Sequence, residues 1–354
     1  MSDDENIVVA TAERIFADLG NSQEIVHAKG ESWKEPLWRA LTDVGLPLAW
    51  VPEAHGGSGA SLMDGFGVLR AAGRSAVSVP LAETMLAGWL LSQGRIVAPK
   101  GKMTVAPSGP RDRVQIGRDG LLNGRARRVP FARDAAHVAV LASSDNGWMV
   151  ALVEAAQCEI EAGSSLAGDG ADTVSFSVVR PVATGPAPAG FDLASLLLMG
   201  SVVRSQQISG ALETMLDISV RYSTERVAFE RTISKYQAVQ HNLARLGGEV
   251  AAAVTAATSA ADALAAEDND HEAIFLEAAS AKIRCGEAAD KGASIAHQVH
   301  GAIGFTSEHV LHRLTLRALA WRDDFGSESY WAAELGKMVS QGGADELWSL
   351  VASR

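Results

Sequence analysis

The sequence predicts a mainly α-helical protein with a small β domain in its middle. Residues 1–100 and 190–354 carry apolar side chains at helical spacing, whereas residues 101–185 hold short β-branched segments interrupted by Gly, Asp and Asn. The chain has 354 residues, of which 47% are hydrophobic, enough to bury a core in each of these regions. We therefore expect an N-terminal helical domain, a middle β domain and a C-terminal four-helix bundle.

The N-terminal region predicts helices on both sides of one loop. Apolar residues recur at helical spacing in Trp33–Val44, and the same spacing resumes in Met63–Gly73 and Leu81–Leu91. Gly45–Gly59 separates them and is dense in Gly and Pro, which break helices.

The middle region predicts a small antiparallel sheet. Its candidate strands are Val114–Ile116, Val138–Leu141, Trp148–Val153 and Thr173–Val179, separated by turn residues. Val182–Phe191 is rich in Pro, Gly and Ala and is interpreted as a linker to the helices that follow.

The C-terminal region predicts four helices, of which three are long and rich in Ala. Their ranges are Asp192–Tyr222, Lys235–Ala266, Glu272–His300 and Glu328–Gly342. Breaks are expected at Asn269–Asp270 and at Gly301. Apolar stripes with many small residues indicate a bundle with closely spaced axes.

Composition excludes several classes of protein. The net charge of −11 gives no surplus of cations for a general nucleic-acid binder. The two cysteines, Cys158 and Cys285, form no metal-ligand pattern and no disulfide framework. No apolar run reaches the roughly 18 residues of a membrane span, and the acidic start has no signal-peptide pattern. We expect a cytoplasmic protein without a membrane partner.

Two C-terminal segments suggest a ligand. Arg226 and Gln237 stand 11 residues apart with Phe229 between them, and Gln298–Ala302 forms a glycine-containing turn. Arginine offers a planar fork for phosphate, and a glycine turn lets backbone N–H groups approach a ligand. The alternative for the first segment is a surface Arg, a core Phe and a Gln at the start of a helix. The alternative for the second is an ordinary helix C-cap at Gly301, with His300 as a bystander.

Together with the loop Val51–Gly59, these segments resemble the acyl-CoA dehydrogenase family, and the resemblance covers nearly the whole chain. It implies FAD as cofactor, held partly by segments that reach across a subunit interface. The residues it implies as FAD contacts are Arg226, Phe229, Gln237, Gln298, Val299, His300, Gly301, Ala302, Ser327 and Glu328.

The resemblance also implies α,β-desaturation of an acyl-CoA thioester, for which a carboxylate removes the α-proton while a hydride passes to the flavin. The two family positions for that carboxylate fall on Phe325 and Ala194, neither of which is acidic. Asp324, next to Phe325, is the candidate base within this chain.

The family segments that cover the flavin ring are also altered. Residues 104–112 and 126–135 depart from the family pattern, and we interpret them as strand edges and loops. Arg125, Arg127 and Arg128 could meet a CoA phosphate or form a solvated strand edge. The chain thus resembles the smaller subunit of bacterial heterotetrameric (α2β2) acyl-CoA dehydrogenases, such as those of steroid side-chain degradation.

This resemblance implies three kinds of partner: an acyl-CoA substrate, a second acyl-CoA dehydrogenase-like subunit or a second copy, and an electron-acceptor flavoprotein. Two alternatives remain open. One is a catalytically silent structural subunit. The other is a flavin-dependent monooxygenase or oxidase on the same fold, because a fold does not fix a reaction.

Overall fold

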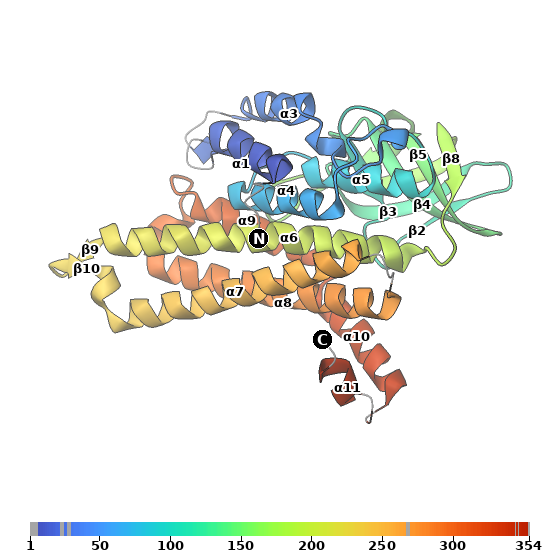
Figure 1. Ribbon diagram of the computed structural model, residues 1–354. Helices are drawn as coiled ribbons and strands as arrows, with labels where there is room; N and C mark the ends of the chain where they lie inside the picture. Colours follow the sequence, from blue (N-terminus) through green and yellow to red (C-terminus); the bar gives the residue numbers. More distant parts are fainter. Residues whose placement is uncertain are drawn as a thin grey trace.

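The structure is a computed structural model that describes residues 6–21, 25–26, 30–266, 270–343, 345 and 347–352. Long helices run side by side through the molecule, short N-terminal helices cover one side of them, and a β-sheet lies at one end (Figure 1). The predicted fold class, mainly α with a middle β region, is confirmed. The predicted domain boundaries stay predictions.

The N-terminal helices agree with the sequence patterns. They are α1 (Ile7–Leu19), α3 (Lys34–Asp43), α4 (Leu62–Ser75) and α5 (Leu81–Gln93). The Ser61 side chain begins α4 with a capping box, because its hydroxyl accepts from the Asp64 N–H and the Asp64 carboxylate accepts from the Ser61 N–H.

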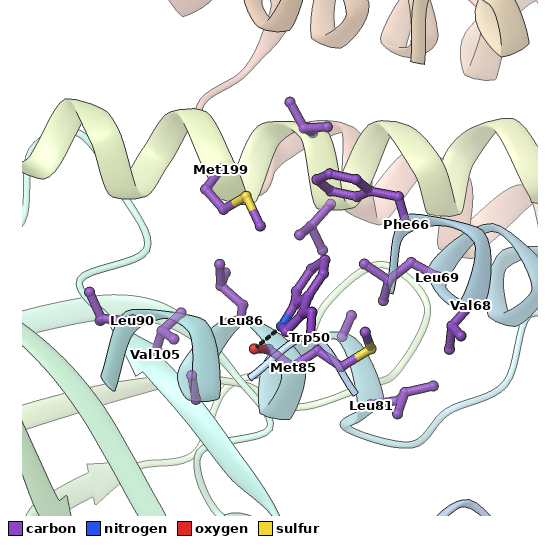
Figure 2. Packing of buried hydrophobic residues seen from close by; sticks show 14 of the residues in the cluster. Trp50, Phe66, Val68, Leu69, Leu81, Met85, Leu86, Leu90, Val105 and Met199 are labelled. Carbon is purple, nitrogen blue, oxygen red and sulfur yellow. Dashed lines mark hydrogen bonds between the residues drawn. The ribbon is translucent and has the colours of Figure 1, made fainter. Parts of the chain in front are cut away.

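The loop after α3 is fixed by one tryptophan. The Trp50 indole N–H donates to the Met85 carbonyl oxygen of α5 at 2.8 Å, and its ring contacts Phe66 of α4 edge to face. Figure 2 shows this ring between α4, α5 and Met199 of the long helix α6. A Cβ on Gly65 would lie 2.2 Å from the ring, so only glycine fits there.

The middle region forms an eight-stranded sheet in the order β6-β7-β3-β2-β4-β5-β8, with β1 paired to β4. Its strands are β1 (Met103–Ala106), β2 (Arg113–Ile116), β3 (Leu122–Pro130), β4 (His137–Ser144), β5 (Gly147–Glu154), β6 (Glu159–Glu161), β7 (Ala171–Val179) and β8 (Ala183–Pro186). The four predicted strands are all present. The prediction of a wholly antiparallel sheet is wrong, because β1 and β2 both pair with β4 in parallel.

The predicted linker Val182–Phe191 is also partly wrong. Ala183–Pro186 forms strand β8, which pairs with β5 along the sheet edge. Its terminal Pro186 lies opposite Met149, a position that an edge strand tolerates. The short strand therefore extends the sheet up to the start of the helical region.

The described part of the C-terminal region contains two more α-helices than the sequence predicts, α9 and α11. Its helices are α6 (Leu193–Glu225), α7 (Gln237–Ala265), α8 (His271–His300), α9 (Leu311–Asp323), α10 (Glu328–Gly342) and α11 (Leu347–Ala352). The break at Gly301 is confirmed and Asp270 caps the start of α8, whereas Asn269 lies outside the described residues. The fourth helix packed with α6 and α8 is α9 and not the predicted α10, which packs mainly on α8.

Helix α6 is the axis of the molecule, since it packs against α4, α7, α8 and α9. Asp192 and Ser195 form a capping box that begins it. Its close approach to α4 depends on Gly73 and Gly210, where a Cβ would lie 2.2 and 2.1 Å from a carbonyl oxygen of the other helix. Within the described residues, no helix is long and apolar enough to span a membrane.

Candidate functional site

One end of α6 carries a hairpin that projects from the bundle (Figure 1). Arg226 ends the helix, and β9 (Val227–Ala228) pairs with β10 (Arg231–Thr232). The two residues between them, Phe229 and Glu230, have φ angles of 51° and 65°. Positive φ at both positions defines a type I′ turn, which usually takes Asn and Gly.

The hairpin and the start of α7 expose side chains that have no hydrogen bond or ion pair to other described residues. The Phe229 ring is 92% exposed, and the side chains of Arg226 and Gln237 are exposed, with no hydrogen bond or ion pair to any described residue. The backbone is nevertheless fixed, because Tyr236 Oη donates to Ala228 O at 3.0 Å. The hairpin therefore holds an arginine fork, an aromatic ring and an amide ready for an external ligand.

The glycine turn lies at the same end of the molecule. Tyr222, one turn before Arg226, stacks on His300 and donates from Oη to the His300 carbonyl oxygen at 3.3 Å. The structure therefore brings the predicted contacts around Arg226 and those of the Gln298–Ala302 turn to one place. We call this region the hairpin end.

A groove of about 760 Å³ opens along the glycine turn, where Gln298, Gly301 and Ala302 line it beside Phe305. These residues are exposed, Phe305 to 70%. The Val299 and His300 side chains are buried, so these two residues can offer only backbone groups to a ligand.

Histidines line the inner side of this turn. Burial and neighbouring imidazoles lower the pKa values of His297, His300 and His309. The His297 ring stacks on Phe305 at 4.0 Å between centroids, and its Nε2 lies 3.0 Å from Thr315 Oγ1. Neutral imidazoles thus pack the turn at ordinary pH.

A second region lies where the sheet meets the other end of α6, and we call it the sheet end. A cleft of about 720 Å³ there joins three segments that are far apart in the sequence: 108–112, 127–128 and 323–330. Arg127 lies 3.1 Å from the buried Asp112 carboxylate, and Arg128 lies 3.9 Å from Asp324. One cleft is thus lined by Asp324, Ser327 and the altered β segments. Its arginines, Arg127 and Arg128, both lie near carboxylates of this chain.

Asp324, the candidate base, is an ion-pair partner of a buried arginine. Its Oδ2 lies 3.0 Å from Arg204 Nη2 and accepts from Arg204 Nε at 3.1 Å. Arg204 is 2% exposed and also donates to Glu83 and Gln207, both at 2.6 Å. Burial raises the pKa of the Glu83 carboxyl, an effect that the Arg204 charge opposes. The Asp324 carboxylate is therefore engaged by a fixed cation.

Phe325, at the family position for the base, points into the core. It is 1% exposed with a φ of 54°, and its ring lies 5.7 Å from the Arg204 guanidinium. A Cβ on Gly200 of α6 would lie 2.4 Å from this ring. The α6 residue facing the loop is therefore Gly200, whereas Ala194, the other predicted position, is exposed at the start of the helix. Neither Gly200 nor Ala194 supplies a carboxylate.

Ser327 and Glu328 begin α10 beside this loop. Ser327 Oγ accepts from the Tyr330 N–H at 3.4 Å and so serves as the N-cap. Glu328 packs against Gly286 of α8, and burial raises the pKa of its carboxyl. Both side chains therefore have structural contacts at the sheet end, apart from the hairpin end.

Three residues of the sheet end were missed from the sequence: Glu83, Arg204 and Lys282. Lys282 is fully buried and donates to the Trp321 and Arg322 carbonyl oxygens, both at 2.8 Å. Burial lowers the pKa of Lys282 to about 7. Glu83 and Arg204 each stand as a lone charge in an apolar helical segment, and this was the available signal. Charged side chains in such a segment are buried, and a buried charge is rarely without a partner.

The two ends are too far apart to serve one small ligand group. Arg204 and Arg226 are on the same helix, and 22 residues at about 1.5 Å each separate them by about 33 Å. Figure 1 shows the β9–β10 hairpin and the sheet at opposite ends of the bundle. The predicted residues therefore form two sets: Arg226, Phe229, Gln237 and 298–302 at one end, and 324–328 at the other.

The comparisons with known proteins agree with this architecture. A family model described as acyl-CoA dehydrogenase, C-terminal domain, matches residues 190–329. The acyl-CoA dehydrogenase IpdE2 of Mycolicibacterium smegmatis is 30% identical over 305 residues, which are 84% of this chain and 86% of that protein.

Solved structures resemble the chain over nearly its whole length. The ChsE4-ChsE5 complex from Mycobacterium tuberculosis has a TM-score of 0.83 at 23% identity, covering 95% of this chain and 97% of the matched one. The Tcur3481-Tcur3483 steroid ACAD has a TM-score of 0.83 at 27% identity, covering 95% and 98%.

Helices, sheet and bundle in this order define a protein with the acyl-CoA dehydrogenase fold. The chain belongs to the acyl-CoA dehydrogenase family, whose members bind FAD. The exposed fork of Arg226, the Phe229 ring and the Gly301 turn suit the phosphates and ring of such a dinucleotide. The sheet end suits it less well, since Arg204 and Phe325 fill the space beside the loop.

Proposed function

We propose that this chain is a FAD-associated subunit of a heteromeric acyl-CoA dehydrogenase whose catalytic carboxylate belongs to a partner subunit. One observation carries the proposal: the only acidic residue beside Phe325 and Gly326, Asp324, is held by the buried Arg204 guanidinium. A base must be free to take a proton, and protonation of Asp324 would remove one of the two carboxylates that pair with this buried cation.

The chain's role would lie at its hairpin end. Arg226 would hold a phosphate of the cofactor, Phe229 would pack beside its adenine ring, and Gln237 would donate a hydrogen bond. The Gly301 turn would offer backbone N–H groups. Bound FAD would accept the hydride in α,β-desaturation, and an electron-acceptor flavoprotein would reoxidise it.

Two relatives support a partner and a bulky substrate. ChsE4-ChsE5 is a complex of two named chains, and the Tcur3481-Tcur3483 protein is a steroid ACAD. We propose a steroid-type acyl-CoA thioester as the substrate class and a second acyl-CoA dehydrogenase-like chain as the partner.

The first measurement is the flavin-to-protein ratio of this chain purified alone and after co-expression with a second acyl-CoA dehydrogenase chain. We expect little FAD with the chain alone and bound FAD in the complex. One FAD per chain in the isolated protein would contradict a shared site.

Variants of the complex then separate the two ends. Arg226→Gln should weaken FAD binding by about tenfold or more, as expected for a lost charge-assisted contact, whereas the exposed Arg39→Gln of α3 should not. Asp324→Asn should keep turnover per bound FAD, and a loss of several hundredfold would identify Asp324 as the base.

A catalytically silent structural subunit is the second candidate, because the paired Asp324 and buried Phe325 favour a chain without chemistry of its own. The Arg226 variant distinguishes the two. Unchanged FAD binding in Arg226→Gln would support the structural role.

A further inference from the structure

A polar cavity of about 440 Å³ lies between the chain before α3, the loop that precedes β7 and the start of α9, and it shares only His312 of its described lining with the groove along the glycine turn. Its lining includes Trp33, Lys34, Ser78, Asp169, Arg313 and Arg317. Neither the hairpin end nor the sheet-end cleft includes these residues. The cavity therefore needs its own explanation.

Arg317 is the anchored cation of this cavity. It is 4% exposed, and its Nη2 donates to Asp169 Oδ1 at 2.9 Å. The Ser78 hydroxyl bonds the same Asp169 oxygen. Arg317 Nε, in contrast, is buried and has no hydrogen-bond acceptor. One N–H of a fixed, nine-tenths buried guanidinium is thus left without a partner in the cavity wall.

Arg313, one helical turn earlier on α9, is less well compensated. Its guanidinium lies 5.7 Å from the centre of the Trp33 ring, and its Nε and Nη2 are buried without an acceptor. No described carboxylate forms an ion pair with it. Burial and the neighbouring Arg317 lower the pKa of Arg313 to about 10, so the group still carries its charge at neutral pH.

The acidic groups that line the cavity, Asp169 and Glu31, are already paired with cations other than Arg313. Asp169 is bound by Arg317 and Ser78, and Glu31 lies 2.5 Å from Lys34 Nζ at the cavity rim. Among the described side chains, Arg313 therefore remains as a half-buried cation without an ion-pair partner. Buried donors without partners destabilise the folded state, and native proteins rarely keep several together.

We propose that this cavity binds a compact oxyanion of the phosphate type, with Arg313 and Arg317 as its donors and Lys34 at the rim. Two guanidinium groups on one helical face can present parallel N–H pairs to the oxygens of one anion. The Trp33 ring holds Arg313 in place from the other side. The inference does not depend on the proposed role in FAD binding.

The test is calorimetric titration of the full chain with inorganic phosphate, against chloride at matched ionic strength. We expect one phosphate per chain, and about tenfold to a hundredfold weaker binding in Arg313→Met, the effect of losing charge-assisted hydrogen bonds. The matched control is Arg118→Gln, a change at an 89% exposed arginine of the β region. Equal phosphate binding in Arg313→Met and the wild type would overturn the proposal.

A second readout separates a ligand site from a structural arginine. Without phosphate, Arg313→Met should be at least as stable as the wild type, because the change removes a half-buried charge without an ion-pair partner. A large loss of stability with phosphate affinity unaltered would refute the site. If Arg313→Met fails to fold, Lys34→Gln replaces it, with weaker phosphate binding expected and unchanged binding as the refuting result.

The source of the phosphate is tested in parallel with coenzyme A. Coenzyme A binding that Arg313→Met weakens, without binding of inorganic phosphate, would assign the cavity to a coenzyme phosphate. The reverse result would assign it to a free anion. Both results support the site, and failure of both ligands in the wild type overturns it, whatever the FAD content of the protein.

Discussion

Arg204 and Arg226 lie on one helix and illustrate how differently the two ends of this molecule are built. Arg204 is 2% exposed and bonded to Glu83, Gln207 and Asp324, whereas Arg226 is exposed and bonded to none of the described side chains. An arginine side chain thus makes hydrogen bonds within the chain at the sheet end and remains available to an external ligand at the hairpin end. A residue type indicates a function only when its hydrogen bonds have been accounted for.

The aromatic residues repeat this contrast. Phe325 and Phe229 both have positive φ, at 54° and 51°, yet Phe325 is 1% exposed and Phe229 is 92% exposed. Backbone strain of this kind persists only where the surroundings or a function require it. At the sheet end the packing around Gly200 and Arg204 supplies that reason, and at the hairpin end we infer that an external ligand does.

The largest expected effect is that of removing the buried cation. Arg204→Met leaves the buried Glu83 carboxyl without its cation and Asp324 with only Arg128 at 3.9 Å, so we expect a loss of about 3–5 kcal/mol in the free energy of unfolding, measured with denaturant. The control is Arg70→Met, which removes one of the two arginines that pair with the partly buried Glu213 between α4 and α6. That change should have a clearly smaller effect, and equal losses would mean that the sheet end is not specially organised.

Two glycine substitutions test how tightly the sheet end is packed around Phe325. Gly200→Ala places a Cβ 2.4 Å from the Phe325 ring, so overpacking should destabilise the protein by about 1–3 kcal/mol. Gly248→Ala in α7 meets no atom within 4 Å and should stabilise it by about 0.5–1 kcal/mol, since Ala favours helix. Thermal unfolding of both variants checks this, and a stable Gly200→Ala would mean that Phe325 can move out of the core.

The buried lysine predicts a pH dependence specific to the sheet end. The pKa of Lys282 is lowered to about 7 in the folded protein from 10.5 for the exposed group, so the unfolded chain binds the extra proton between these values. Stability should therefore rise with pH above about 7, by at most about 1.4 kcal/mol per unit. Above about pH 9 the thiol of Cys285, whose pKa burial raises to about 12, acts in the opposite direction.

The measurement is the unfolding free energy between pH 7 and pH 8.5. Lys282→Met should flatten the rise, and it should also lower stability because the Trp321 and Arg322 carbonyls lose their donor. An unchanged slope in this variant would assign the pH dependence to other groups.

The sequence predicted the hairpin end better than the sheet end, for a physical reason. Arg226, Phe229, Gln237 and the Gly301 turn lie in two short segments, and the structure brings these segments together through Tyr222 and His300. Local spacing alone could indicate these residues because the Arg226, Phe229 and Gln237 side chains are exposed and depend on no distant partner. Their roles toward FAD stay predictions.

The sheet end depends on contacts between distant segments. The Glu83–Arg204–Asp324 cluster joins residues 121 and 120 positions apart, and no local pattern links them. Helix α9 was missed for a related reason: His and Arg interrupt Leu311–Asp323, and Arg317 is buried only because Asp169 of a distant loop pairs with it. Tertiary pairing thus overrode the local pattern in both cases.

The smallest expected effect concerns the turn at the tip of the hairpin. Phe229→Asn with Glu230→Gly gives the type I′ turn the residues it prefers, so backbone amides of residues 227–232 should gain about 1 kcal/mol of protection in hydrogen exchange. FAD retention in the complex should fall, because the exposed ring is gone. Glu230→Gly alone keeps Phe229 and should gain part of the protection without losing cofactor. A double variant that gains protection and keeps its FAD would show that Phe229 has no cofactor role. Gained protection together with lost FAD, the expected result, would mean that the strained turn is maintained for binding.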